Sequence, residues 1–252
     1  MLSVKTTKML AGVTISGTYS DLDLLYDALF NVIGTDRCYN GYYQSQLRVM
    51  GLCYEIRHAY QGDRQESEND YGEKIYSLNY YWPEIIFLYA VLEDFILYSR
   101  MSCCYLQQEG IEKQFLNKEI IEERKERLPD DAAYVEYFRS LIKNALGRTI
   151  DEKKFKRLIT YFDYKFDYSG TLRKMIFVDY CTQWVDIQNV KYLKRAPEKR
   201  RSYLATIAEK IIYDNYDYKY LRHDLLEYEK ELKTPYYEIE LEGMQYPDKI
   251  EW

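Results

Sequence analysis

The densest group of residues able to do chemistry lies between Glu55 and Arg64. The stretch reads Glu-Ile-Arg-His-Ala-Tyr-Gln-Gly-Asp-Arg and contains His58, one of only two histidines in the chain. Histidine titrates near neutral pH, so His58 could act as a general acid, a general base or a metal ligand. Arg57 and Arg64 carry planar guanidinium groups that suit a carboxylate or a phosphate. The stretch is therefore a candidate acid–base and anion-binding site.

A second polar pair, Asn79 and Glu84, stands at the entry of a strongly apolar segment. Placed opposite the end of the preceding helix, this entry would face His58 across a cleft. Either Asp63 or Glu84 would then orient the imidazole. The candidate catalytic residues are His58, Arg57, Asp63, Arg64 and Glu84.

The same residues also have a purely structural interpretation, which the sequence favours. His58 shares a helix face with Leu47 and Tyr54 and would then be a core histidine. The arginines and Asp63 would form an ion-paired helix end, and Glu84 would stabilise the first turn of its helix through the helix dipole.

Metal and cofactor chemistry has little support. Glu55 and His58 have the Glu-x-x-His spacing of di-iron helical bundles, which need a second such pair on a facing helix. His223 has Tyr220 three residues earlier, so that second pair is missing. A single metal held by His58 and carboxylates is the weaker alternative. The chain has no CxxC, GxxxxGK[ST], GxGxxG, HExxH or GxSxG motif, so we predict neither a cofactor nor a metal.

Net charge and composition limit the classes of partner that the protein could bind. The net charge of −6 argues against non-specific binding to nucleic acid or to an anionic membrane. Two basic runs, 153–157 and 194–201, could meet RNA locally, but such runs are usually solvated faces. The 30 tyrosines are unusual. They suit a contact surface, although compositional bias of the source genome is the plainer explanation.

The chain reads as soluble and cytoplasmic. Its longest apolar stretch, 85–98, is interrupted by Glu93 and Asp94 and is too short to cross a bilayer. The opening residues show no signal peptide. The five cysteines form no CxxC pair, which is typical of reduced thiols.

The elements that must position the candidate residues are mostly helices. The start predicts a β-hairpin over 2–17, and a polar loop is expected at 63–76. Capping boxes are expected at Ser20 with Asp23 and at Thr149 with Glu152, and Pro129 should end a helix. Predicted helices cover 20–33, 44–61, 83–102, 107–128, 131–146, 152–162, 171–187, 197–212 and 217–232, and a strand covers 236–242.

These elements predict a mainly α fold. A multi-helix globule would surround the central apolar helix at about 83–102. The small antiparallel β element would combine the N-terminal hairpin with the strand near the C-terminus. We expect a single domain over 1–252, with Pro129 as a candidate sub-boundary.

Three phrases resemble an uncharacterised family of bacterial proteins of unknown function. They are Thr-x-x-Leu-Ala-Gly-Val-Thr-Ile-Ser-Gly at 7–17, the run at 47–64 and Trp-Pro-Glu-Ile-Ile-Phe at 82–87. The resemblance covers roughly the first hundred residues and implies no activity. The resemblance includes the segments 47–64 and 82–87, which contain the candidate residues, and so favours a cleft between them.

Three functions follow, and whether the protein is an enzyme stays open. The leading hypothesis is an interaction or regulatory protein with a protein partner, a tyrosine-rich contact surface and an unspecified oligomeric state. The alternative is a hydrolase of a phosphodiester or nucleotide substrate, with His58 as acid/base. The second alternative is RNA binding through Lys194 to Arg201, which would depend steeply on salt.

Overall fold

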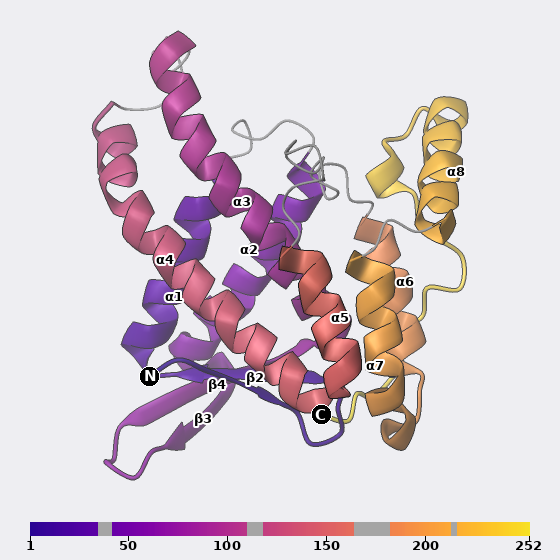
Figure 1. Cartoon of the computed structure of the whole chain (residues 1–252), viewed down its shortest axis with the longest axis horizontal. Helices are drawn as coiled ribbons and strands as arrows, with labels where there is room; N and C mark the ends of the chain where they lie inside the picture. The colour runs from indigo at the N-terminus through magenta and orange to yellow at the C-terminus, as the bar shows by residue number, and fades with distance from the viewer. Residues whose placement is uncertain (35–41, 110–117, 164–181, 213–215) are drawn as a thin grey trace. The chain divides into compact units, whose positions relative to one another are not determined.

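The computed structural model describes residues 1–34, 42–109, 118–163, 182–212 and 216–252 (Figure 1). Most of the connection between the predicted helices at 20–33 and 44–61, and most of the predicted helix at 171–187, lie outside these residues. The chain packs as two compact units. Unit 1 contains Met1–Val4, Ile15–Leu78 and Val91–Ile142, and unit 2 contains Lys5–Thr14, Asn79–Ala90 and Lys143–Trp252.

The architecture confirms a mainly α fold with a small antiparallel sheet. The strands β1 (Ser3–Thr6), β2 (Gly12–Gly17), β3 (Gln65–Glu68) and β4 (Lys74–Tyr81) have the order β1-β2-β4-β3. The helices are α1 (Tyr19–Ile33), α2 (Tyr43–His58), α3 (Trp82–Glu109), α4 (Lys118–Thr149), α5 (Glu152–Asp163), α6 (Thr182–Leu193), α7 (Pro197–Ile212) and α8 (Tyr216–Leu232), with short turns η1 (Ala59–Asp63) and η3 (Tyr236–Glu238). None of the described helices is long and apolar enough to span a membrane.

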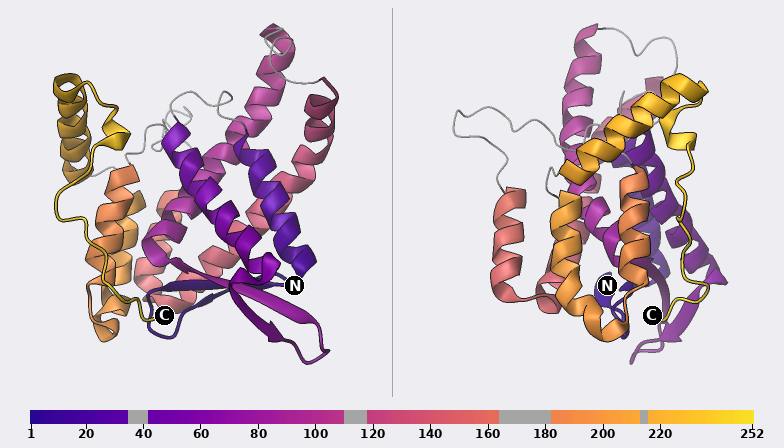
Figure 2. Two further views of the ribbon diagram at one scale, coloured as in Figure 1. Left: turned by 180° about the vertical axis from the view of Figure 1, so that it is seen from behind. Right: turned by 90° about the vertical axis from the view of Figure 1, so that its right-hand side faces the viewer.

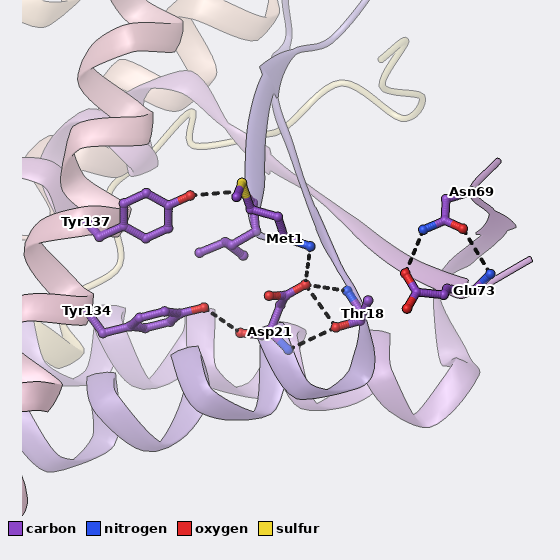
Figure 3. Close-up of polar contacts among 8 residues, drawn as sticks. Met1, Thr18, Asp21, Asn69, Glu73, Tyr134 and Tyr137 are labelled. Atoms are coloured by element: carbon purple, nitrogen blue, oxygen red, sulfur yellow. Dashed lines mark hydrogen bonds and ion pairs between the residues drawn. The ribbon is translucent and has the colours of Figure 1, made fainter. Parts of the chain in front are cut away.

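Helix α1 begins at a capping box that lies two residues earlier in the chain than the predicted one. Thr18 Oγ1 accepts from Asp21 N, and the Asp21 carboxylate accepts from Thr18 N, so Ser20 and Asp23 do not form the box. The amino group of Met1 lies 2.8 Å from the same carboxylate (Figure 3). Burial acts to raise the pKa of Asp21, but these donors outweigh it and lower the pKa.

The predicted loop at 63–76 is instead the β3–β4 hairpin, which extends past β1 and β2 (Figure 2). Its first strand, Gln65–Glu68, is exposed throughout, so the sequence lacks the apolar alternation that marks a strand. Backbone pairing forms it, with Gln65 opposite Ser77. The turn is closed by Asn69, whose Oδ1 accepts from the backbone of Tyr71 and Glu73.

Helix α2 packs on the face opposite to the one predicted. Leu47 and Tyr54 are 45% and 51% exposed, so the face that they share with His58 points to water. The buried face contains a glutamine with a structural role. Gln46 Nε2 donates to the carbonyls of Ile33 and Gly34 at the end of α1. Because Gln46 is polar, the pattern of apolar residues does not identify the face of α2 that is buried.

Helix α3 confirms the central apolar helix. Pro83 lies in its first turn, and the side chains from Ile85 to Leu92 are buried. Helix α4 contradicts the predicted stop, because it continues through Pro129 to Thr149. A proline removes one backbone hydrogen bond. The loss is offset by burial of Leu128 before it and Ala132 after it.

In unit 2, helix α5 is capped by Asp151, whose Oδ1 accepts from the backbone of Lys153 and Lys154. The predicted cap Thr149 instead donates to the carbonyl of Ala145. Helices α6 and α7 lie side by side (Figure 1). The predicted strand at 236–242 is wrong, since Tyr236–Glu238 form a 3-10 turn and the residues after it form neither helix nor strand.

Candidate functional site

His58 ends α2, and the next five residues form the π-helical turn η1, which returns Asp63 towards the helix. The return needs a left-handed residue, and Gly62 supplies it with φ of 93°. His58 Nδ1 lies 2.7 Å from Asp63 Oδ2. The side chains of His58 and Asp63 are 23% and 57% exposed, so the pair stands at the surface and not in the core.

The flanking charges are paired as well. Arg64 donates through Nε and Nη2 to both carboxylate oxygens of Glu55, at 2.8 Å and 3.1 Å. Arg57 lies over the Tyr54 ring, 5.6 Å from its centroid. The His58 ring packs on the same tyrosine, with centroids 4.2 Å apart. A surface imidazole oriented by a carboxylate, next to an exposed arginine, is chemically able to transfer a proton beside an anion.

Next to this cluster lies a group of aromatic rings from α1 and η1, here called the aromatic surface: Tyr19, Tyr26, Phe30 and Tyr60. The Tyr60 ring meets Tyr19 edge-on, with centroids 5.1 Å apart, and meets Tyr26 edge-on at 6.4 Å. Tyr26 stacks on Phe30 at 6.2 Å. Tyr19 is 51% and Phe30 44% exposed. These rings pack on each other while remaining in contact with water.

The aromatic surface carries negative charge. Burial raises the pKa of Tyr60, and the carboxylates of Asp23 and Asp27 raise it further. Asp23 lies on α1 between Tyr19 and Tyr26, one helical turn from each. At the edge, Asp27 faces Arg127 of α4 across 3.5 Å.

Glu84 lies in unit 2, where it is 7% exposed. Its Oε1 accepts from Asn189 Nδ2 of α6 at 2.7 Å. Asn189 Nδ2 also donates to the hydroxyl of Tyr246 at 3.2 Å, and that hydroxyl donates to Asp186 at 3.1 Å. Glu84 therefore lies at the buried end of a hydrogen-bonded chain of unit 2 whose other end, at Tyr246, is exposed.

One buried carboxyl group of unit 1, Asp94, was not among the candidates. Asp94 of α3 is 8% exposed, and its Oδ2 has no hydrogen-bond partner among the described residues. Burial raises the pKa of Asp94 to about 7, Glu93 adds to the rise, and Arg139 opposes it. Asp94 therefore changes charge near neutral pH inside unit 1.

Several basic side chains of the two runs are already paired with groups of the same chain. Arg200 is 5% exposed, and its guanidinium donates to the carbonyls of Met9, Leu193 and Arg195. In the other run, Lys156 pairs with Glu152, and Arg157 pairs with Glu209. Fewer cations remain for RNA than the sequence suggests. Among the described residues, no group of histidines, cysteines and carboxylates could hold a metal ion.

The sequence located part of this geometry. His58 and Asp63 do meet, and Glu55, Arg57 and Arg64 surround them. Whether they act on a substrate stays a prediction. The aromatic surface was missed, although Tyr19, Tyr26 and Phe30 stand seven and four residues apart, which places them on one face of a helix. The hydrogen bond between Glu84 and Asn189 joins residues 105 positions apart, and no local sequence pattern predicts such a contact.

Comparison with known families finds one match, which covers residues 2–252 and is described as a domain of unknown function, DUF6904. The match extends through nearly the whole chain, so the resemblance is not limited to the first hundred residues. Comparisons with curated proteins and with solved structures each found no match. The chain therefore belongs to the DUF6904 family, whose function is unknown.

Proposed function

We propose that the protein is a non-enzymatic interaction protein that binds a basic segment of a partner protein through the aromatic surface. One observation carries the proposal: four rings from α1 and η1 pack on one another at the surface of unit 1. Aromatic side chains supply much of the binding energy in protein interfaces. A cluster of them that faces water is typical of a contact site.

The chemistry of the partner follows from charge. The faces of aromatic rings attract cations, and Asp23 adds negative charge next to Tyr60. Tyrosines elsewhere in the chain do hold cations, since Lys74 lies 5.3 Å from the Tyr76 ring. Among the described residues, no cation lies over a ring of the aromatic surface. An arginine or lysine of a partner fits this position.

The test uses a defined probe, a fluorescently labelled peptide of alternating arginine and glycine, and measures fluorescence anisotropy with the full chain. The double variant Tyr26→Ala, Phe30→Ala should weaken binding about tenfold or more, because each lost ring removes on the order of 1 kcal/mol of contact. Asp23→Asn should weaken it less and should reduce its salt dependence. A glutamate–glycine peptide should not bind.

Tyr71→Ala is the matched control, because Tyr71 is 89% exposed at the tip of the β3–β4 hairpin. That variant should bind as the unmodified chain does. Circular dichroism checks that the double variant is folded. Equal losses in Tyr71→Ala and in the double variant, or no binding by the unmodified chain, would reject the proposal.

A second candidate function is the hydrolysis of a phosphodiester. The 2.7 Å contact between His58 and Asp63 favours it, because a carboxylate that orients an imidazole supports acid–base catalysis. Arg57 would hold the anion, since Arg64 is engaged by Glu55. With bis-p-nitrophenyl phosphate as substrate, His58→Ala should reduce the rate about a hundredfold or more. His223→Ala is the control, and equal rates in both variants would remove this candidate.

We also propose a cytoplasmic location. Cys53 is a free, buried thiol, as is usual in a reducing compartment. Burial raises the pKa of Cys53 to about 12, so the thiol stays protonated and unreactive. Fractionation of source cells with an antibody to the protein tests the location, and enrichment in a membrane or secreted fraction would contradict it.

A further inference from the structure

Two neighbouring carboxamides of α6, Gln188 and Asn189, are completely buried in unit 2. Within the described part of the chain, neither Oε1 nor Nε2 of Gln188 has a hydrogen-bond partner, and Oδ1 of Asn189 has none. Buried polar atoms are nearly always paired with protein or with an ordered molecule, because leaving them unpaired costs free energy. Three such atoms on consecutive residues call for something that pairs with them.

The paired atoms around these carboxamides lead out to the surface. Asn189 Nδ2 donates to Glu84 and to the hydroxyl of Tyr246, which in turn donates to Asp186. Tyr246 is 38% exposed and belongs to the segment 239–252. The hydroxyl of Tyr246 therefore connects the buried Asn189 carboxamide with the surface.

The segment 239–252 has neither helix nor strand to hold it. The Tyr81 ring stacks with Trp252 at 5.1 Å and with Tyr246 at 6.1 Å. Arg200 Nη1 also donates to the carbonyl of Glu251 at 3.3 Å. Side-chain contacts of this kind release a segment more readily than a helix or a sheet does. These contacts hold the segment against Tyr81 and Arg200.

We propose that Gln188 and Asn189 form a binding site for a small uncharged ligand that presents an N–H beside a C=O, as a carboxamide or a nucleobase does. Gln188 offers a donor and an acceptor, and Asn189 offers an acceptor. The carboxylates of Glu84 and Asp186 next to them disfavour an anion. This site is independent of the aromatic surface, which belongs to unit 1.

The experiment measures the melting temperature of the full chain with nicotinamide or uracil at millimolar concentration. At least one probe should raise the melting temperature by about 2 °C or more, because a ligand that binds only the folded state stabilises it. Gln188→Met keeps the size of the side chain and removes its polar atoms, so it should abolish the shift. Tyr237→Phe, a change in another exposed tyrosine of unit 2, should leave the shift unchanged.

A second measurement does not depend on any variant being folded. In the unmodified chain, the side-chain amide signal of Gln188 in an NMR spectrum should move as the probe is added. Tyr246→Phe removes only the hydroxyl and should change the apparent affinity about threefold or more. The proposal is overturned if neither probe moves the Gln188 signal. It also fails if a crystal structure with the probes shows an ordered water only, or if Gln188→Met keeps the full shift.

Discussion

The end of α2 and the entry of α3 carry the same kinds of side chain in opposite surroundings. At the end of α2, His58, Asp63 and Arg64 are paired at the surface of unit 1. At the entry of α3, Glu84 is paired with Asn189 inside unit 2. Water screens the first set, so each pair contributes about 0–1 kcal/mol to stability. Removing one partner of a buried pair costs several times more.

The difference separates the residues that hold the fold from the residues that are free to contact something else. Removing a hydrogen-bond partner of the buried Glu84 carboxylate should destabilise unit 2. The surface ion pairs of unit 1 should contribute less to its stability, because water screens their charges. Measured stabilities of variants in the two regions test this division directly.

The largest effect is expected from Asn189→Ala, which removes the donor to the buried Glu84 carboxylate. The free energy of unfolding should fall by about 3 kcal/mol. Urea unfolding followed by circular dichroism measures it. A loss below about 0.5 kcal/mol would place this carboxylate in the same class as the surface pairs.

The second effect depends on pH and concerns Asp94 of unit 1. Because the folded pKa of about 7 is above the ordinary value of 3.8, the stability contributed by the protonated carboxyl is complete below pH 3.8 and is lost as pH rises through 7. Asp94→Asn should therefore stabilise the protein at pH 8 by about 4 kcal/mol relative to its effect at pH 4. Urea unfolding at both values measures the difference, and an equal effect at both would show that folding does not raise the pKa of Asp94.

The smallest effects are expected at the end of α2. Asp63→Asn and Glu55→Gln each leave the neighbouring side chains exposed to water, so the free energy of unfolding should change by less than about 0.5 kcal/mol. The same urea titration applies. A loss above about 2 kcal/mol would mean that these pairs hold the fold, and the contrast between the two regions would disappear.

The sequence predicted the elements whose apolar spacing is regular. The N-terminal hairpin, α1, the apolar part of α3, α7 and α8 are where the pattern places them. The β3–β4 hairpin was missed because its first strand is entirely polar and depends on backbone pairing. Pro129 predicts a helix end by its propensity alone, whereas α4 continues through it between the buried side chains of Leu128 and Ala132.

In the candidate site, too, the contacts between residues close in sequence were predictable and the contacts between distant residues were not. The meeting of His58 and Asp63 follows from a spacing of five residues with Gly62 between them. The hydrophobic pattern assigned Leu47 and Tyr54 to the core, yet both are exposed, because Gln46 and its neighbours form the buried face. The contact between Glu84 and Asn189 depends on tertiary packing and leaves no trace in local sequence.

Hydrogen exchange with and without the arginine–glycine peptide tests the central claim most directly. If the aromatic surface is the contact site, the peptide should slow amide exchange in α1 and η1, and the Tyr26→Ala, Phe30→Ala variant should lose that protection. Protection confined to other elements, or none in α1 and η1, would contradict the account.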